Sequence, residues 1–407
     1  MSWETVKLGD VCSKIGSGAT PRGGSTVYIE KGITFIRSQN VYNLSFNYSG
    51  LVFINDEAAT KLKGVTIKES DVLLNITGDS VARTCIVPSD VLPARVNQHV
   101  AIVRPKSEIL NPIFLNYYLA SPYMQSFMLG IAVGKGTSRN AMTKDMIAEF
   151  EVPCPPIKVQ QKIIDILKPY DSLIENNRKQ IKLLEEAAQR LYKEWFVDLH
   201  FPGYEDVEIV AGVPEGWKYK RVDEFGEVIT GKTPSTSKSE YYGGSIPFVT
   251  IPDMHGKVFP LVTEKTLTKT GADTQKNKYL PINSVIVSCI ATVGLVNIAV
   301  EPCQTNQQIN SVILYDDSNL YFFYESMKRI KTLLDGVGSN GATMTNVNKT
   351  KFSNISVLYP TEDLVKRYNA FCKPIFNKIL GLSKGILVSK QARDRLLPKL
   401  MSGEIEV

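Results

Sequence analysis

The chain repeats itself about 210 residues apart, and each copy ends in a segment of heptad rhythm. Trp3 and the pair Thr20-Pro21 correspond to Trp217 and the pair Thr233-Pro234. Later blocks match at offsets of 213, 209 and 205: residues 33–36 with 246–249, Asn97-Gln98 with Asn306-Gln307, and Pro155 with Pro360. Collinear matches whose offset changes in steps are what duplication followed by loop insertions leaves. We therefore expect two similar domains, each followed by a long helix.

Length and composition narrow the class of protein. With 407 residues, the chain is long enough for two domains with separate cores, and 43% hydrophobic with 22% charged residues is typical of globular proteins. There is no apolar run of membrane-spanning length and no charged leader followed by an apolar stretch, so we expect a cytoplasmic protein without membrane contact. The six cysteines form no CxxC pair, and with three histidines a structural metal site is not expected.

The net charge of +6 is mildly basic and does not by itself identify a nucleic-acid-binding protein. Any contact with DNA has to come from local patches.

The pattern of short apolar runs and turn residues predicts an α+β fold. Strands are expected at 33–37, 72–76, 100–103, 246–251, 284–290 and 311–315 because these runs are rich in Val, Ile and Thr. A helix is expected after Asn111-Pro112, with a counterpart from about residue 320 to 334. We place the boundaries at 1–156 for the first domain, 157–200 for its helix, 201–360 for the second domain, and 361–407 for its helix.

Both helical segments carry apolar residues at alternating steps of three and four, which is the a/d seam of a coiled coil. The first seam contains Ile163, Leu167, Tyr170, Ile174, Asn177, Ile181, Leu184 and Leu191. The second contains Ile375, Ile379, Leu382, Ile386, Leu396 and Leu400, with Ser389 and Arg393 weakening it near its end. Two seams of matched length in one chain predict that the helices pack together.

An antiparallel pairing would place the two domains at opposite ends of the coil, related by an approximate internal twofold axis. Residues 160–195 would then form a rod of roughly 50 Å, or about 15 base pairs of DNA. Pro169 and Pro374 interrupt both seams at the same place and predict a kink or a restarted helix. Asn177 either fixes the register of the coil or lies near solvent.

Apolar residues also extend beyond the seam on both helices: Ile164, Ile166, Leu173, Phe371, Phe376 and Leu397. Such a wide stripe either packs against the chain's own domains or forms docking faces for partner helices.

Several stretches resemble the specificity subunits of type I restriction-modification systems. They are the opening Trp3-to-Pro21 pattern, Arg190-Leu-Tyr-Lys-Glu-Trp-Phe-Val-Asp-Leu-His-Phe-Pro-Gly203, Val213-Pro-Glu-Gly-Trp217, and Arg395-Leu-Leu-Pro-Lys-Leu-Met-Ser-Gly-Glu-Ile405. The match covers the whole chain, and the order of the pieces makes it specific. The resemblance implies a DNA reader without catalytic activity, whose two target recognition domains bind an interrupted, two-part sequence in double-stranded DNA.

The resemblance also implies partners. Two methyltransferase subunits would dock on the helices and transfer methyl groups from S-adenosylmethionine to adenine N6, and motor-nuclease subunits using ATP and Mg²⁺ would join the complex. No cofactor is expected on this chain. The sequence has no Asn-Pro-Pro-Tyr or Asp-Pro-Pro-Tyr motif for amino-methyl transfer and no GxxxxGK[ST] phosphate loop, which agrees with chemistry on other subunits.

Base reading requires side chains that reach the groove edges, with Arg favouring guanine and Asn or Gln favouring adenine. For the first domain the candidates are Arg37, Ser38, Gln39, Asn40, Arg83, Gln98, Lys135, Thr137, Ser138 and Arg139. For the second domain they are Thr250, Asp253, His255, Lys257, Lys265, Lys269, Lys276, Lys278, Ser339, Asn340 and Thr343. An ordinary solvated loop stays an alternative for each, and the repeated Asn-Gln and Thr-Pro pairs favour structural turns.

Two other functions stay open at this point. A coiled-coil adaptor without DNA sequence specificity would account for the helices alone. A self-contained restriction-modification enzyme would need the methyltransferase and nuclease motifs that the sequence lacks.

Overall fold

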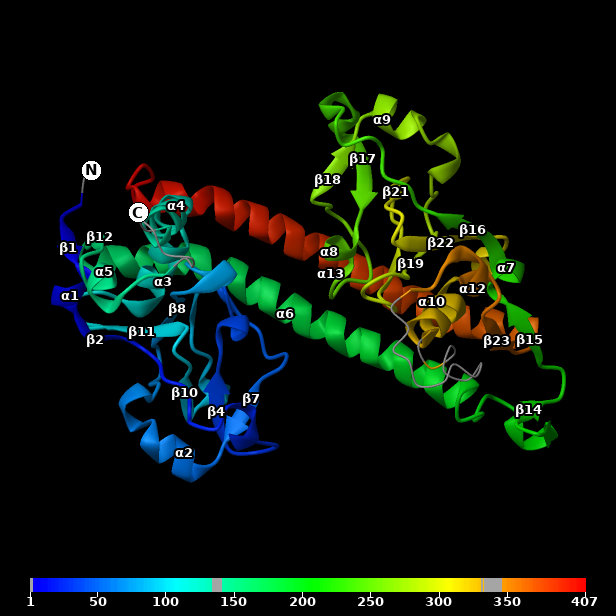
Figure 1. The fold of residues 1–407 in the computed structure, drawn as a ribbon, viewed down its shortest axis with the longest axis horizontal. Coiled ribbons are helices and arrows are strands. Elements are labelled where there is room, and N and C mark those ends of the chain that lie inside the picture. The colour runs from blue at the N-terminus through cyan, green and yellow to red at the C-terminus, as the bar shows by residue number, and fades with distance from the viewer. Residues whose placement is uncertain (1–2, 134–140, 331, 333–345) are drawn as a thin grey trace. The chain divides into compact units, whose positions relative to one another are not determined.

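Two helices of 40 residues each organise the protein, α6 (Ile157–Phe196) and α13 (Glu362–Met401), in a computed structural model that describes residues 3–133, 141–330, 332 and 346–407 (Figure 1). Every predicted seam position on both helices is buried or half-buried, including the polar residues Asn177, Ser389 and Arg393. The period of three and four therefore identified the buried face correctly. Neither Pro169 nor Pro374 ends its helix, so the predicted restart at these prolines is wrong.

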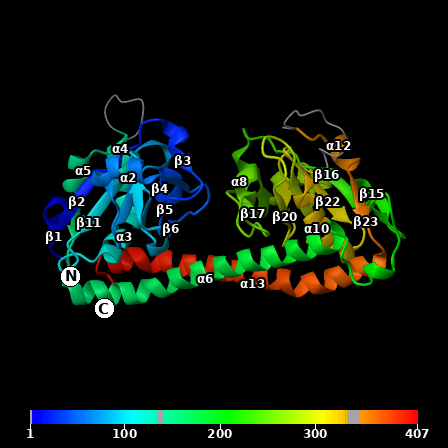
Figure 2. The same cartoon turned by 90° about the horizontal axis from the view of Figure 1, so that it is seen from below.

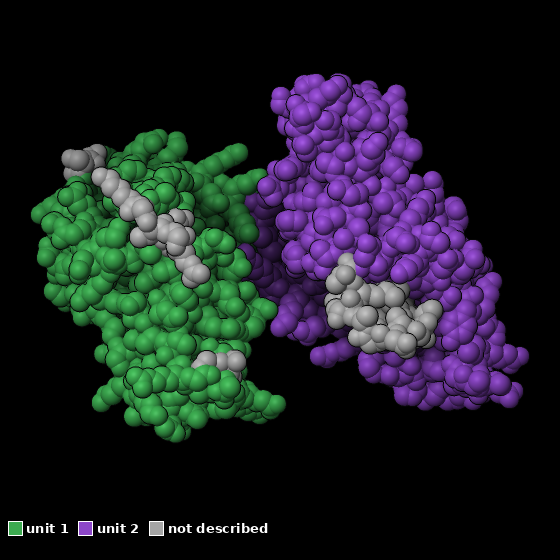
Figure 3. Space-filling view, in the orientation of Figure 1, with its two compact units in different colours: residues 1–174, 388–407 green, residues 175–387 purple. Residues whose placement is uncertain are grey.

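The chain forms two compact units, each containing one part of both long helices (Figure 3). The first unit consists of residues 1–174 and 388–407, and the second of residues 175–387. In the first unit Asp171 contacts Arg393, and in the second the hydroxyl of Tyr368 donates a hydrogen bond of 3.2 Å to the carbonyl of Ala188. Because the partner number falls as the position along α6 rises, the helices pair antiparallel.

The first unit contains a four-stranded sheet of order β2-β11-β8-β9 and a second sheet of order β10-β4-β7-β3. In the second sheet β10 runs parallel to β4. The strands are β1 (Thr5–Lys7), β2 (Cys12–Ser17), β3 (Tyr28–Ile29), β4 (Ile33–Ile36), β5 (Val41–Tyr42), β6 (Ser45–Phe46), β7 (Val52–Ile54), β8 (Val72–Asn75), β9 (Thr84–Ile86), β10 (Ala94–Val96), β11 (Val100–Pro105) and β12 (Glu151–Pro153). The helices are α1 (Leu8–Val11), α2 (Asp56–Lys61), α3 (Pro112–Ala120), α4 (Pro122–Ala132) and α5 (Lys144–Ala148).

The second unit repeats this topology. Its four-stranded sheet has the order β16-β22-β19-β20, and a smaller sheet of order β18-β17-β21 again contains one parallel pair, β17 with β21. The strands are β13 (Ile209–Val210), β14 (Val213–Pro214), β15 (Lys218–Arg221), β16 (Gly226–Thr230), β17 (Tyr242–Val249), β18 (Lys265–Leu267), β19 (Val285–Ser288), β20 (Val296–Ile298), β21 (Gln304–Thr305), β22 (Ile309–Leu314) and β23 (Ser356–Tyr359). The helices are α7 (Val222–Phe225), α8 (Ile251–Met254), α9 (Lys269–Asp273), α10 (Leu320–Lys328) and α12 (Lys349–Ser353). The predicted α+β fold with two similar domains and two long paired helices is confirmed.

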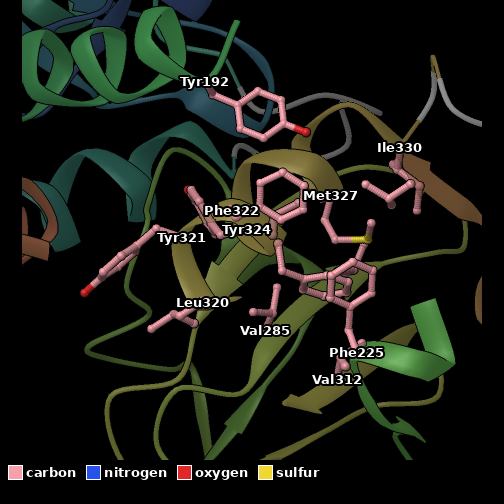
Figure 4. Packing of buried hydrophobic residues seen from close by; sticks show 14 of the residues in the cluster. Tyr192, Phe225, Val285, Val312, Leu320, Tyr321, Phe322, Tyr324, Met327 and Ile330 are labelled. Atoms are coloured by element: carbon pink, nitrogen blue, oxygen red, sulfur yellow. The ribbon is translucent and has the colours of Figure 1, made fainter. Parts of the chain in front are cut away.

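Each unit buries one helix that packs on its four-stranded sheet, α3 in the first unit and α10 in the second, together with segments of α6 and α13. In each unit the segments of α6 and α13 lie along one side of the sheets (Figure 2). In the first unit Phe114 and Leu115 of α3 share a core with Ile163 and Leu400. In the second unit α10 takes the same place, and Figure 4 shows Phe322 and Met327 packed with Tyr192 of α6. The long helices are thus part of each domain core, because α3 and α10 cover apolar residues of α6 and α13 that lie outside the coiled-coil seam.

The residues beyond the seam divide into two groups. Ile164, Phe376 and Leu397 are buried in the cores, as the packing alternative predicted. Ile166, Leu173 and Phe371 stay exposed, with 36%, 47% and 57% of their surface accessible. No helix within the described ranges is both long enough and apolar enough to cross a membrane.

The side chains where α6 meets α13 and the neighbouring short helix differ between the two units, although the positions are equivalent in the repeat. In the first unit the hydroxyl of Tyr117 donates to Asp171 at 2.5 Å, and Arg393 contacts the other oxygen of the same carboxylate at 2.5 Å. In the second unit the position of Tyr117 is taken by Glu325, which is 3% exposed and has one oxygen without a hydrogen-bond partner among the described residues. Burial raises the pKa of Glu325 to about 7, Lys328 opposes this and the nearby Glu185 adds to it. The charged network of Tyr117, Asp171 and Arg393 in the first unit is therefore not repeated at the equivalent positions of the second unit.

Arg393→Ala is expected to destabilise the purified chain by about 3 kcal/mol, because it leaves the Asp171 carboxylate mostly buried without its cation. Urea unfolding of both forms measures the difference. Arg395→Ala is the matched control, since Arg395 is exposed on the same helix and should change stability by less than about 0.5 kcal/mol. Equal stability of wild type and Arg393→Ala would show that the network contributes nothing to helix pairing.

Candidate nucleic-acid interface

In the first unit, four of the predicted residues lie in one loop that follows β4. Arg37 donates to the carbonyl of Gly50 at 2.6 Å, and Gln39 reaches the same carbonyl at 3.3 Å. Asn40 is fully buried, accepts from the backbone N–H of Arg37, and donates to the carbonyls of Asn47 and Ser49. Asn40 therefore holds the loop closed, whereas the exposed Gln39 and the half-buried Arg37 are the members that can reach a ligand.

Arg83 is attached to the same region by a ring contact. Its guanidinium carbon lies 4.5 Å from the centre of the Tyr42 ring, in the β5–β6 hairpin that continues the loop. The buried Asn75 joins the two parts, because its side chain donates to the carbonyl of Ser38 at 2.9 Å and its backbone N–H to the carbonyl of Arg83 at 2.8 Å. The structure thus brings Arg37, Ser38, Gln39 and Arg83 together at one edge of the unit.

In the second unit, Thr250 and Asp253 form the counterpart of the Arg37–Asn40 loop. Asp253 is 5% exposed and accepts from the backbone N–H and the hydroxyl of Thr250. Its other oxygen accepts from the backbone N–H of Glu264 at 2.8 Å. Asp253 is therefore engaged within the fold in the same way as Asn40, and it holds the start of the loop that presents His255 and Lys257.

His255 and Lys257 are exposed, and the buried side-chain amide of Asn297 holds the backbone of their loop. Asn297 of β20 donates to the carbonyls of Met254 and Lys257, the latter at 2.6 Å. Sequence analysis missed Asn297, because a buried Asn inside a strand carries no pattern that links it to a loop 40 residues away.

The basic stretch of the second unit is tied to a neighbouring turn by buried glutamines. Gln275 donates to the carbonyl of Lys232 at 2.6 Å and to Gln304, and Gln304 donates to the carbonyl of Ala272. This places Lys276 and Lys278, in the short 3-10 helix η8 (Lys276–Lys278), beside the exposed Lys232. Within the described ranges, the ammonium groups of these three lysines form no ion pair, so their charge is available to an anionic ligand.

Lys265 and Lys269 lie on the strand and helix that lead to η8, and both are exposed. Lys265 lines a groove of about 310 Å³ together with Tyr242, Glu264 and Thr236. The basic stretch therefore forms part of the surface of a single unit rather than a solvated tail.

A turn near the parallel strands is the same in both units. Thr20 donates to the side chain of Gln98, and Thr233 donates to that of Gln307 at 2.6 Å. The preceding glycines have no room for a side chain, because a Cβ at Gly18 or Gly231 would lie 2.2 Å from a backbone oxygen. The glycines of these turns therefore allow the close approach of the two chain segments, while the structural role of the Thr-Pro pairs stays a prediction.

The remaining candidates lie outside the described residues: Lys135, Thr137, Ser138, Arg139, Ser339, Asn340 and Thr343. The chain re-enters the described part at Ala141 and Asn346, which form isolated bridges with Thr77 and Ile290. Thr77 and Ile290 each lie two residues after a strand, β8 and β19, so the chain re-enters the described part at equivalent places.

The described residues contain no group of three or more His, Cys, Asp or Glu side chains placed to hold a metal ion. Four of the six cysteines are buried, and burial raises the pKa of Cys85 and Cys303 to about 12. A thiol with such a pKa is a poor nucleophile at neutral pH.

Comparison with known proteins gives a consistent result. The family model described as the type I restriction modification DNA specificity domain matches residues 1–186 and 214–370. The HindI specificity subunit of Haemophilus influenzae is 31% identical, with 99% of each chain covered. The MjaIX specificity subunit of Methanocaldococcus jannaschii is 25% identical, covering 100% of this chain and 94% of the relative.

A solved structure supports the fold. The S subunit of a type I restriction-modification system from M. genitalium covers 98% of this chain and 96% of its own, with 13% identity and a TM-score of 0.58.

Replacing both Lys269 and Lys276 with Ala is expected to weaken binding of duplex DNA to a similar extent whatever its sequence, because lysines contact phosphates. The slope of log K against log salt should fall by about two, one for each lost phosphate contact. Fluorescence anisotropy of the purified chain at several salt concentrations measures both effects. Lys158→Ala together with Lys162→Ala, on the exposed surface of α6, is the control, and an unchanged slope for the Lys269/Lys276 variant would remove these lysines from the interface.

Proposed function

Because this chain belongs to the type I restriction-modification DNA specificity family, we propose that it reads a two-part DNA sequence for a complex that methylates adenine N6 and restricts DNA. The observation that carries this proposal is the combination of one repeated topology with two different polar edges. A shared fold places both edges in equivalent positions, and different side chains at those edges select different bases. The family match leaves the adaptor and the self-contained enzyme without support.

The two recognition edges would be held apart by the paired helices. Each helix has 40 residues, which corresponds to a rod of about 60 Å or about 18 base pairs. The antiparallel contacts found in each unit suit a rod whose two halves are related by an internal twofold axis. We propose that the rod sets the length of the gap between the half-sites.

The exposed apolar residues of the helices would bind the methyltransferase subunits. Ile166 of α6 and Phe371 of α13 occupy equivalent positions of the repeat, and both flank the seam. Phe371 is held against Trp195, with ring centres 5.7 Å apart. Exposed apolar side chains at two equivalent positions would be covered by two copies of the same partner.

The chemistry would reside on those partners. S-adenosylmethionine is proposed to bind the methyltransferase subunits, and ATP and Mg²⁺ the motor-nuclease subunits, while this chain contributes recognition without catalysis in the cytoplasm. The adenine to be methylated must leave the base stack to reach a methyltransferase pocket. The chain's part is to position that pocket over the correct base.

Coexpression of the chain with its methylating partner, followed by mapping of modified adenines in the host genome, tests this function. We expect a gapped, asymmetric consensus with one modified adenine in each half-site. The two halves should differ in sequence because the two polar edges differ. Modification at one uninterrupted motif, or at adenines without a consensus, would contradict the proposal.

A further inference from the structure

One exposed polar residue, a glutamine, occupies the same position in both units, although the neighbouring loops differ in sequence. Gln98 and Gln307 are both exposed, and each is held by a threonine from the Gly-x-Thr-Pro turn. We call these two assemblies the paired turns: residues 18–21 with 97–99, and residues 231–234 with 306–308. We propose that the paired turns bind the same chemical group in both half-sites, a phosphate of the DNA backbone, through the amide of Gln98 and of Gln307.

The backbone of the paired turns is the same in both units, bond by bond. Gly18 and Gly231 donate to the carbonyls of Val100 and Ile309 at 2.9 and 3.0 Å. The residues after them, Ala19 and Lys232, donate to the last carbonyls of β10 and β21. Each glutamine is therefore presented from an equivalent, tightly fixed frame.

The structural work of the turns is done by other side chains. Asn97 and Asn306 accept from the backbone N–H two residues further on, at 3.2 and 3.1 Å. The glycines supply the close approach. A hydrogen bond between exposed side chains, such as that of Thr233 with Gln307, adds little to stability in water. Its repetition is better explained by the orientation it gives to the amide.

That orientation favours an acceptor as the ligand. The threonine hydroxyl donates to Oε1 of each glutamine, which leaves the amino group to face a partner. The amino group of Gln307 has no acceptor within the described ranges, and that of Gln98 lies 3.3 Å from His99 Nε2. A donor held in place suits a phosphate oxygen, whereas bidentate reading of adenine also needs the carbonyl.

The position of the paired turns fits this role. Asn97 donates to the carbonyl of Ile36, directly before Arg37, and Asn306 donates to that of Val249, directly before Thr250. The glutamines thus lie beside the loops that differ between the units and are proposed to read bases. Phosphates are alike in every sequence, so a contact to them can be repeated where base contacts cannot.

The inference rests on the proposed function, and binding assays on the complex of this chain with its methylating partner test it. Gln98→Ala and Gln307→Ala should each weaken binding of the target duplex and of a random duplex by the same factor, about 2- to 10-fold. The double variant should show the product of the two factors. Gln98→Glu should lose more than Gln98→Ala at low salt, because a carboxylate repels phosphate, and this excess should shrink as salt is raised.

Gln189→Ala, at an exposed position of α6, is the matched control and should bind as wild type. Thr233→Val keeps Gln307 but removes its orienting hydroxyl, and it should weaken both duplexes by about 2-fold. A loss confined to the target duplex would assign the glutamines to base reading and overturn the proposal. Unchanged binding by the double variant would leave them a purely structural role and also overturn it. Wild-type complex that does not prefer the target over random DNA would instead refute the proposed function.

Discussion

The antiparallel packing of α6 against α13 is the interaction on which the rest of the structure depends. Both helices enter the core of both units, so neither unit can bury the helix that packs on its sheet, α3 or α10, without residues from both α6 and α13. Leu400 and Ile163 close the first core, while Tyr192 and Tyr368 close the second. The packing of α6 on α13 therefore contributes to the stability of each unit.

The two seams are not interchangeable, although the repeat makes them similar. The network of Tyr117, Asp171 and Arg393 exists in the first unit, and at the equivalent place the second unit has Glu325, Phe376 and Ala188. Burying a charge is tolerated where it is paired, so a register shift that separates Arg393 from Asp171 costs several times the thermal energy. Asn177, whose amide nitrogen lies 3.1 Å from the position of a Cβ at Gly385, adds a close contact near the middle of α6. These polar positions favour one pairing of the two helices over shifted alternatives.

Sequence periodicity predicted the seam and the α+β fold because both depend on apolar spacing alone. Ile163, Leu167 and Leu400 are buried as predicted, and the run 33–37 forms β4 (Ile33–Ile36). The role of Asn40 could not be foreseen, because whether an exposed-looking Asn faces a ligand or clamps its own loop depends on carbonyls seven and nine residues away. The continuity of α6 through Pro169 was also beyond sequence reasoning, because the local rule for proline predicts an interrupted or kinked helix. The sequence did contain a signal for Gln307, the repeated Asn-Gln pair, but its meaning depends on the backbone hydrogen bonds that the two paired turns share.

The central claim is that the paired helices measure the distance between the two half-sites. Deleting one heptad from each helix, residues 175–181 and 381–387, keeps both seams in phase and removes the contacting pair Asn177 and Gly385 together. The rod should then be shorter by about 10 Å, and the gap in the modified sequence shorter by about three base pairs, with both half-site sequences unchanged. Retention of the original gap by this variant would contradict the account.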